Sequence, residues 1–173
     1  EPLLIQAMTL MKPVKGENNP EYAILEAELA EVYFVQEKYA LAEPLYRKSL
    51  ITLKQQKGKA REDYHRHLLS LARLLHKSGT PGQAEPLYLE LKEEIKSSSG
   101  TKRKDHIDLI ENLGDLYVET KKYHLAEPLY KEALDYRKKH MEDDWKSFIL
   151  ISDNLSELYR KTRRFDLAEP LLL

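Results

Sequence analysis

Hydrophobic residues recur along this chain at the spacing of helix faces. One stripe is formed by Ile110, Leu113, Gly114 and Tyr117, at positions that fall on one side of an α-helix. A second stripe follows a short polar break and is formed by Ala126, Leu129, Tyr130, Ala133 and Leu134. The pattern predicts two successive helices. The small residues Gly114 and Ala126 mark where these helices approach closely, because a bulky side chain would hold the backbones apart.

The same two-helix pattern is repeated along the chain. The sequence Ala-Glu-Pro-Leu occurs at residues 42–45, 84–87, 126–129 and 168–171, always 42 residues apart, and the chain opens in phase with it on Glu-Pro-Leu. A fixed period of this size indicates one supersecondary unit that is copied and stacked. We expect a single array over residues 1–173, divided into a partial repeat 1–20 (second helix and junction), repeats 21–62, 63–104 and 105–146, and a truncated repeat 147–173.

Other residues fall into columns of the same period. One column is all leucine, at Leu29, Leu71, Leu113 and Leu155, and ten of the eleven tyrosines also stand in columns. We therefore interpret the tyrosines as large packing residues with their hydroxyl groups at the edge of the core. A cluster of functional aromatic residues is the alternative.

Helix-breaking residues mark the turns. Thr80 followed by Pro81 predicts the start of a second helix. Three glycines 42 apart, Gly16, Gly58 and Gly100, are expected to be left-handed C-caps after second helices. If second helices begin near Tyr39 and Tyr123, the motif prolines lie about one and a half turns inside them and each removes a backbone hydrogen bond. The alternative is that second helices begin later, with proline in the first turn.

These columns resemble the tetratricopeptide repeat (TPR). The 42-residue length and the Ala-Glu-Pro-Leu-Tyr sequence are similar to the kinesin-light-chain subclass, as is the run Gly-Glu-Asn-Asn-Pro-Glu-Tyr-Ala at residues 16–23. The resemblance implies an all-α, right-handed superhelical TPR solenoid of antiparallel helix pairs. It also implies a non-enzymatic scaffold that binds a peptide or partner protein in a concave groove lined by first helices.

The resemblance places groove positions at fixed offsets from the leucine column. The residues at these positions are Glu28, Glu31, Phe34, Val35, Arg66, Leu69, Ser70, Arg73, Lys77, Asp108, Glu111, Asn112, Asp115, Glu119, Asp153, Asn154 and Glu157. Their charge runs from acidic to basic and back to acidic. We therefore expect a peptide with an acidic centre, basic flanks and a large apolar anchor, since charge patterns set specificity and register. Lys131 and Arg137 are expected on the opposite, convex face.

Composition and motifs disfavour catalysis. The chain has no cysteine, and it has no glycine-rich phosphate loop and no His-Glu-x-x-His zinc motif. His65 and His67 are two residues apart and face different ways on a helix, so we expect solvated or edge-packed histidines and no metal site. No cofactor is expected.

Charge and hydropathy limit the partners. The net charge is −1, and the basic stretch 54–77 is opposed by an acidic stretch 17–43, so nucleic-acid binding is disfavoured. No apolar run approaches the ~20 residues of a membrane span, and a cytoplasmic protein is the default expectation. The chain starts and stops inside a repeat, as a fragment would. Head-to-tail self-association is the alternative function, through apolar ends formed by Leu3, Leu4, Ile5, Met8, Leu171, Leu172 and Leu173.

Overall fold

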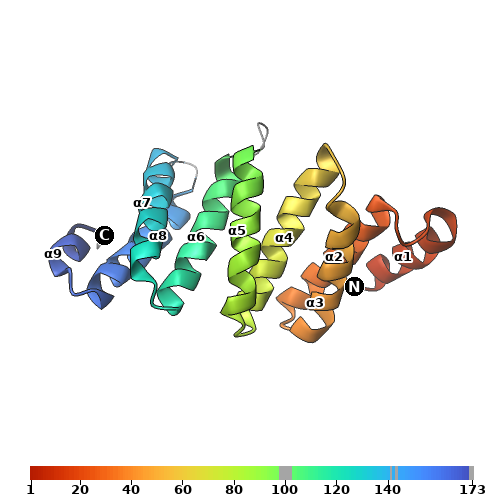
Figure 1. Cartoon of the computed structure of the whole chain (residues 1–173), viewed down its shortest axis with the longest axis horizontal. Coiled ribbons are helices and arrows are strands. Elements are labelled where there is room, and N and C mark those ends of the chain that lie inside the picture. Colours follow the sequence, from red (N-terminus) through yellow and green to blue (C-terminus); the bar gives the residue numbers. More distant parts are fainter. Residues whose placement is uncertain (98–102, 141, 143, 172–173) are drawn as a thin grey trace. The chain divides into compact units, whose positions relative to one another are not determined.

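The computed structural model describes residues 1–97, 103–140, 142 and 144–171 of the chain (Figure 1). The chain divides into two compact units, Glu1–Leu91 and Lys92–Leu173. Unit 1 contains α1 (Pro2–Lys15), α2 (Pro20–Val35), α3 (Tyr39–Leu53), α4 (Lys59–Lys77) and the first part of α5 (Pro81–Ser97). Unit 2 contains the end of α5, α6 (Arg103–Glu119), α7 (Tyr123–Lys139), α8 (Trp145–Lys161), α9 (Phe165–Ala168) and the 3-10 turn η1 (Glu169–Leu171).

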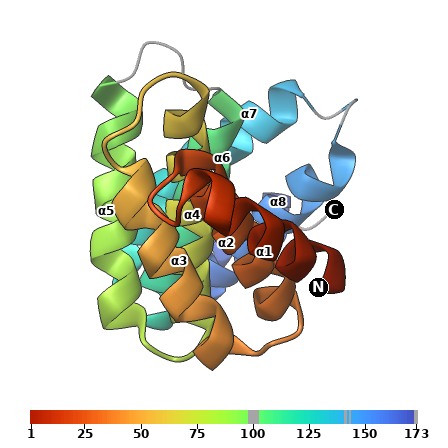
Figure 2. The ribbon, with the colours of Figure 1, turned by 90° about the vertical axis from the view of Figure 1, so that its right-hand side faces the viewer.

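Each unit is built from helices that pack against their neighbours in sequence. In unit 1, α2 packs on α3, α3 on α4, and α1 on α2, and Figures 1 and 2 both show α1 beside α2. In unit 2, α6 packs on α7 and α7 on α8. Every element in the described part of the chain is helical. The predicted all-α fold of helix pairs is confirmed, whereas the division into one array of five segments stays a prediction.

The turn within each pair has the same backbone conformation. Its central residue has a positive φ in all four copies, at Glu37, Gly79, Lys121 and Arg163. In the first copy, the N–H of Lys38 donates to the oxygen of Tyr33 and the N–H of Glu37 donates to that of Phe34, both at 2.9 Å. This pair of bonds is the Schellman motif, which closes a helix through a left-handed residue. Three of the four turns therefore hold a residue with a Cβ where glycine would be unstrained.

The junctions between pairs differ from the prediction. Gly16 follows α1 and has φ 77° and ψ 163°, and Gly58 has φ 61° and ψ −137°. Both ψ values lie far outside the left-handed helical region, so the expected left-handed C-caps are wrong. Gly58 is instead the N-cap of α4, because α3 ends at Leu53 and the extended ψ redirects the chain into the next first helix. Gly100 lies outside the described residues.

The motif prolines lie inside the second helices. Pro44, Pro86 and Pro128 are interior residues of α3, α5 and α7, so the alternative of later helix starts is wrong. Pro81 is the first residue of α5, as predicted. The Thr80 hydroxyl donates to the backbone oxygen of Leu75 at 2.8 Å, which ties the start of α5 to the end of α4.

The core follows the predicted columns. The motif alanines and the tyrosine rings that follow them are buried, at Ala42, Ala84, Ala126, Tyr46, Tyr88 and Tyr130. Gly114 is the packing glycine that the sequence indicated: a Cβ built there would lie 2.5 Å from Cε1 of Tyr130. The close approach of α6 and α7 in unit 2 therefore depends on the absence of a side chain at Gly114.

Replacement of Glu37 by glycine should stabilise the protein. Glu37 has φ 58°, which costs a residue with a Cβ about 1 kcal/mol that glycine avoids. We expect Glu37→Gly to raise the free energy of unfolding by about that amount in urea titrations. The neighbouring Gln36 has φ −82°, so Gln36→Gly should destabilise slightly, and equal effects of the two changes would contradict the assigned turn.

Candidate functional site

The first-helix face of unit 1 brings two cations over an aromatic ring. The guanidinium of Arg73 and the ammonium of Lys77, both on α4, lie 5.7 and 5.6 Å from the centroid of the Phe34 ring on α2. At these distances a cation is attracted to the ring face. Phe34 is only 7% exposed, whereas the next residue, Val35, is 74% exposed. Val35 is therefore the apolar side chain at this end of α2 that is exposed to a ligand.

Arg73 and Lys77 are the available cations among the predicted groove positions of unit 1. Neither forms an ion pair with a residue in the described ranges, whereas Arg66 pairs with the carboxylate of Asp63 at 2.8 Å. Among the other predicted groove positions of unit 1, Glu28 is exposed, Leu69 is half-buried and Ser70 is buried. The basic character predicted for α4 thus resides mainly in Arg73 and Lys77.

Glu31, an acidic groove position of unit 1, is tied to the core. Its carboxylate accepts a hydrogen bond from the hydroxyl of Tyr46 on α3. Burial, together with this carboxylate, raises the pKa of the Tyr46 hydroxyl. Glu31 therefore links a first helix to its second helix and is less available to a ligand than its position suggests.

In unit 2, a buried arginine holds the acidic groove positions. Arg137 of α7 is 5% exposed, and its guanidinium donates to both oxygens of Glu111 at 2.8 and 2.9 Å. The same group donates to Asp108 at 2.5 Å and to Asp144 at 3.3 Å. Bidentate pairs of this kind are among the strongest charged hydrogen bonds. The expectation that Arg137 lies on an exposed convex face is wrong, because its side chain reaches between the helices.

This cluster also fixes the start of α8. Asp144 is the N-cap of α8 and accepts a hydrogen bond from the backbone N–H of Ser147 at 3.3 Å. Burial raises the pKa of Glu111, and the bonds from Arg137 oppose that rise. Sequence reasoning missed the cluster, because Arg137 stands among other basic residues at the end of α7, where cations are common near a helix C-terminus.

The two asparagines expected to bind a ligand backbone donate within the protein. The amide of Asn112 donates to the backbone oxygen of Asp108 at 2.5 Å, and the amide of Asn154 donates to the Asp115 carboxylate at 3.1 Å. Asp115 also accepts from the hydroxyl of Tyr130 at 2.5 Å. These groups therefore brace α6, α7 and α8 against one another.

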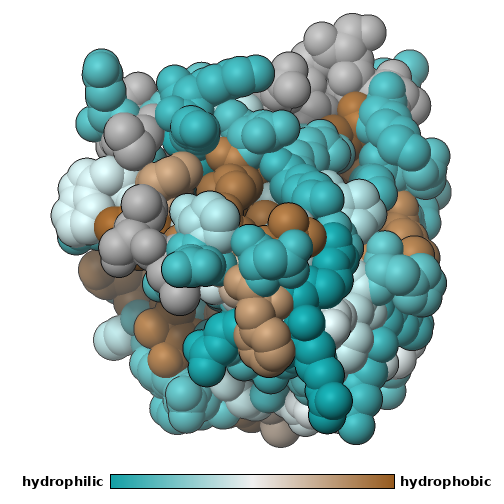
Figure 3. Space-filling model, turned by 90° about the vertical axis from the view of Figure 1, so that its left-hand side faces the viewer, coloured by the Kyte–Doolittle hydropathy of each residue, from teal (hydrophilic) through white to brown (hydrophobic). Residues whose placement is uncertain are grey.

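The remaining acidic positions of unit 2 face solvent. Glu119, Asp153 and Glu157 are exposed, and Glu157 pairs with Arg160 at 3.3 Å and Lys161 at 3.2 Å. Figure 3 shows a face on which brown hydrophobic patches are separated by teal hydrophilic side chains. Exposed apolar residues of unit 2 are Trp145, Ile149, Leu150, Phe165, Leu125 and Leu167.

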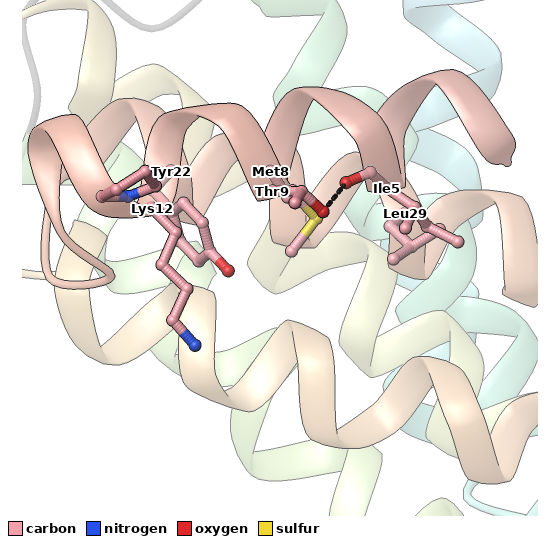
Figure 4. Close-up of a pocket in the computed structure, with 7 residues that line it drawn as sticks. Ile5, Met8, Thr9, Lys12, Tyr22 and Leu29 are labelled. Atoms are coloured by element: carbon pink, nitrogen blue, oxygen red, sulfur yellow. Dashed lines mark hydrogen bonds between the residues drawn. The ribbon is translucent and has the colours of Figure 1, made fainter.

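A separate apolar cavity lies between α1 and α2 in unit 1 (Figure 4). Its volume is about 780 Å³, and its lining residues are Ile5, Met8, Thr9, Lys12, Pro13, Tyr22 and Leu29. The Lys12 ammonium pairs with Glu17 at 2.5 Å. The N-terminal apolar residues expected at an open end are exposed in part: Leu3 and Ile5 face solvent, and Leu4 and Met8 are half-buried. At the other end Leu171 is half-buried, and Leu172 and Leu173 lie outside the described residues.

The paired histidines of α4 are core residues. His65 and His67 are both buried, so they are edge-packed and not solvated; the His67 ring centroid lies 6.4 Å from that of Tyr46. Burial lowers the pKa of His67 to about 4. Within the described ranges, no group of three or more His, Asp or Glu residues is arranged to hold a metal ion, and no helix there is long and apolar enough to cross a membrane.

Comparisons with known proteins agree with this architecture. The model of the family described as "Tetratricopeptide repeat" matches residues 63–139. No curated protein sequence matches the chain. Among solved structures, BtubC (BKLC) from P. vanneervenii superposes with a TM-score of 0.85 at 20% identity, over 98% of this chain and 68% of that one.

Two further structures share the fold. The putative kinesin light chain repeats of Podosopora anserina give a TM-score of 0.77 at 16% identity, over 98% of this chain and 81% of that one. The apo form of RapI gives 0.82 at 17% identity, over 97% of this chain and 58% of that one. The chain therefore has the tetratricopeptide-repeat fold, and its structure is similar to kinesin-light-chain-like repeats.

Loss of the buried arginine should destabilise unit 2. Arg137→Met keeps the apolar stem but leaves Asp108, Glu111 and Asp144 without their shared cation. We expect a loss of about 2 kcal/mol in denaturant titrations, less than for a fully buried pair because the carboxylates keep some solvent. Lys131→Met removes an exposed α7 cation paired with Glu127 and should cost no more than about 0.5 kcal/mol. Equal losses in the two variants would show that burial of Arg137 is unimportant.

His67 should make stability fall in mild acid. Its pKa is about 4 in the folded protein and about 6.5 in an unfolded chain. As pH drops from 6.5 to 4, only the unfolded state binds the proton, so folding loses about 3 kcal/mol over this window. We expect His67→Gln to flatten the pH dependence of the free energy of unfolding between these values. The exposed change His124→Gln should keep the parent slope, and an unaltered slope in His67→Gln would rule the assignment out.

Proposed function

We propose that this protein is a non-catalytic interaction module that binds a peptide or a partner protein on its first-helix faces. The observation that carries the proposal is the arrangement of Arg73 and Lys77 over Phe34, beside the exposed Val35. Two cations without internal carboxylate partners in the described ranges, next to an exposed aliphatic residue, suit a ligand with an acidic side chain and an apolar neighbour. Repeat arrays present extended binding surfaces of this kind.

The first-helix face of unit 2 favours the opposite charge. Exposed Glu119, Asp153 and Asp115 make this face acidic, and exposed Leu150 lies on the same helix as Asp153. Such a face suits a basic residue with an apolar neighbour. Each unit therefore offers a subsite of its own, and the two subsites differ in charge.

Self-association is the second candidate function. It is supported by the exposed side chains of Leu3 and Ile5 on α1 and by the apolar cavity between α1 and α2. Light scattering at increasing protein concentration separates the two functions, since a concentration-independent monomer removes this candidate.

The peptide-binding proposal is tested by selecting ligands from a random peptide library on the whole chain. Arg73→Gln with Lys77→Gln removes two charges but keeps side chains that cover Phe34. We expect at least roughly tenfold weaker binding of acidic selected peptides, with a smaller salt dependence, measured by fluorescence polarisation. The matched control, Arg47→Gln with Lys54→Gln, removes two exposed cations from the second-helix side of unit 1. If the control weakens binding and the α4 variant does not, the ligand lies on the second-helix face.

A further inference from the structure

A second cavity lies in unit 2 beside the turns within its helix pairs. Its volume is about 350 Å³, and its lining residues are Lys121, Tyr123, His124, Glu127, Leu158, Thr162 and Arg164. The first residues come from the α6–α7 turn and the start of α7, and the last come from the end of α8 and the α8–α9 turn. The cavity is therefore built from equivalent turns of two neighbouring repeats.

The only carboxylate among the lining residues is already neutralised. Glu127 accepts from both terminal nitrogens of Arg164, at 2.6 and 3.2 Å, and from Lys131 at 2.7 Å. These bonds lower the pKa of Glu127 to about 2, so it stays ionised and held by two cations. The guanidinium of Arg164 is fixed further by stacking 4.8 Å over the Tyr159 ring. The carboxylate does not, therefore, cancel the remaining positive charge of the cavity.

Additional cations stand at the turns themselves. Lys121 lines the cavity and Arg163 lies between two lining residues, and neither forms an ion pair within the described part of the chain. Both have positive φ, 59° and 60°. A residue with a Cβ is strained in this conformation. Such strain is an indication of function when the side chain is charged and able to bind a ligand. In unit 1 the same turn position holds an acidic residue, Glu37, in one copy and Gly79 in the other, and neither supplies a cation.

We propose that this cavity binds a phosphorylated serine or threonine of a partner protein. A phosphate monoester carries nearly two negative charges and three acceptor oxygens, which suits a small cavity that is lined by Lys121 and lies next in sequence to Arg163. The volume of the cavity is at the lower end of the range for ligand sites. A cavity of this size suits the side chain of one phosphorylated residue. This inference rests on the proposed partner-binding function and names a modification that would regulate it.

The surrounding charges argue for a single phosphorylated residue over an extended polyanion. Glu119, Glu157 and Asp166 are exposed close in sequence to the two turns. An RNA strand or an anionic membrane would bring many negative charges against these carboxylates, and each such contact lowers affinity. A single phosphate group on a peptide meets only the cations of the cavity.

The test uses the whole chain and a degenerate peptide library with a fixed central phosphoserine, compared with libraries that carry serine or glutamate at that position. We expect the phosphoserine library to bind more tightly than the serine and glutamate libraries, measured by fluorescence polarisation, and this gain to fall at least roughly tenfold for Lys121→Gly with Arg163→Gly. Because glycine suits the positive φ at both turns, this variant should fold at least as well as the parent, as judged by its melting temperature. Equal binding of the three libraries would overturn the proposal, as would equal binding by the parent and the variant.

Matched control variants separate this cavity from the other cationic surfaces of the protein. Lys138→Gln with Lys139→Gln removes two cations from the far end of α7 and should leave phosphopeptide binding unchanged. The Arg73→Gln, Lys77→Gln variant should also keep it, whereas Lys121→Gly with Arg163→Gly should keep binding to peptides of the first-helix face. Failure of the proposed function and failure of this inference are thus distinguished. Binding to phosphatidylserine vesicles that is lost in the double-glycine variant, without preference for phosphopeptides, would overturn the inference in favour of a membrane surface.

Discussion

The close approach of the two helices in each repeat is the constraint on which this structure depends. In unit 2 it is achieved by placing the ring of Tyr130 on α7 against Gly114 on α6, where there is no room for a Cβ. The ring supplies much of the buried apolar area of a repeat, and its hydroxyl must then reach a polar partner at the edge. In two repeats that partner is a carboxylate on the first helix, Glu31 for Tyr46 and Asp115 for Tyr130. Packing and polar bracing are thus parts of one contact.

This constraint explains why so much of the fold could be predicted from the sequence. A residue that packs in the same way in every copy leaves a column, and the columns of leucine, alanine and tyrosine correctly indicated the core and the helix pairs. Residues that break a column were harder to interpret. Glu26 stands where other repeats have Leu68 and Ile110, is 1% exposed, and pairs with Lys48 at 2.6 Å. The burial of Glu26 could be predicted from its position in an apolar column. Its pairing with Lys48 could not be predicted, because it depends on how the helices pack in three dimensions. The ψ angles of Gly16 and Gly58 were equally inaccessible, because a glycine permits many conformations and the sequence does not select among them.

The candidate site shows a second limit of sequence reasoning. Position on a first helix indicates that a side chain points toward the predicted groove, but not that its charge or hydrogen bonds remain available. Asp108 and Glu111 are held by Arg137, and Asn154 donates to Asp115. Arg73 and Lys77 have no such carboxylate partners among the described residues. Fewer side chains are therefore available to the proposed ligand than the predicted set contains, and Arg73 and Lys77 of α4 are among them.

The repeats also serve as internal controls for separating structural from chemical requirements. The four turns between paired helices place the same backbone demand on residues 37, 79, 121 and 163, yet the side chains there are glutamate, glycine, lysine and arginine. Glycine satisfies the backbone best, so the turn itself does not account for a charged side chain at this position. Lys121 lines a cavity in which the single lining carboxylate is already neutralised, and Arg163 lies in sequence between two lining residues of the same cavity. The same backbone position thus carries different side chains in the four turns. Where the residue is strained and its charge suits a neighbouring cavity, the backbone does not explain the side chain, and a functional explanation is needed.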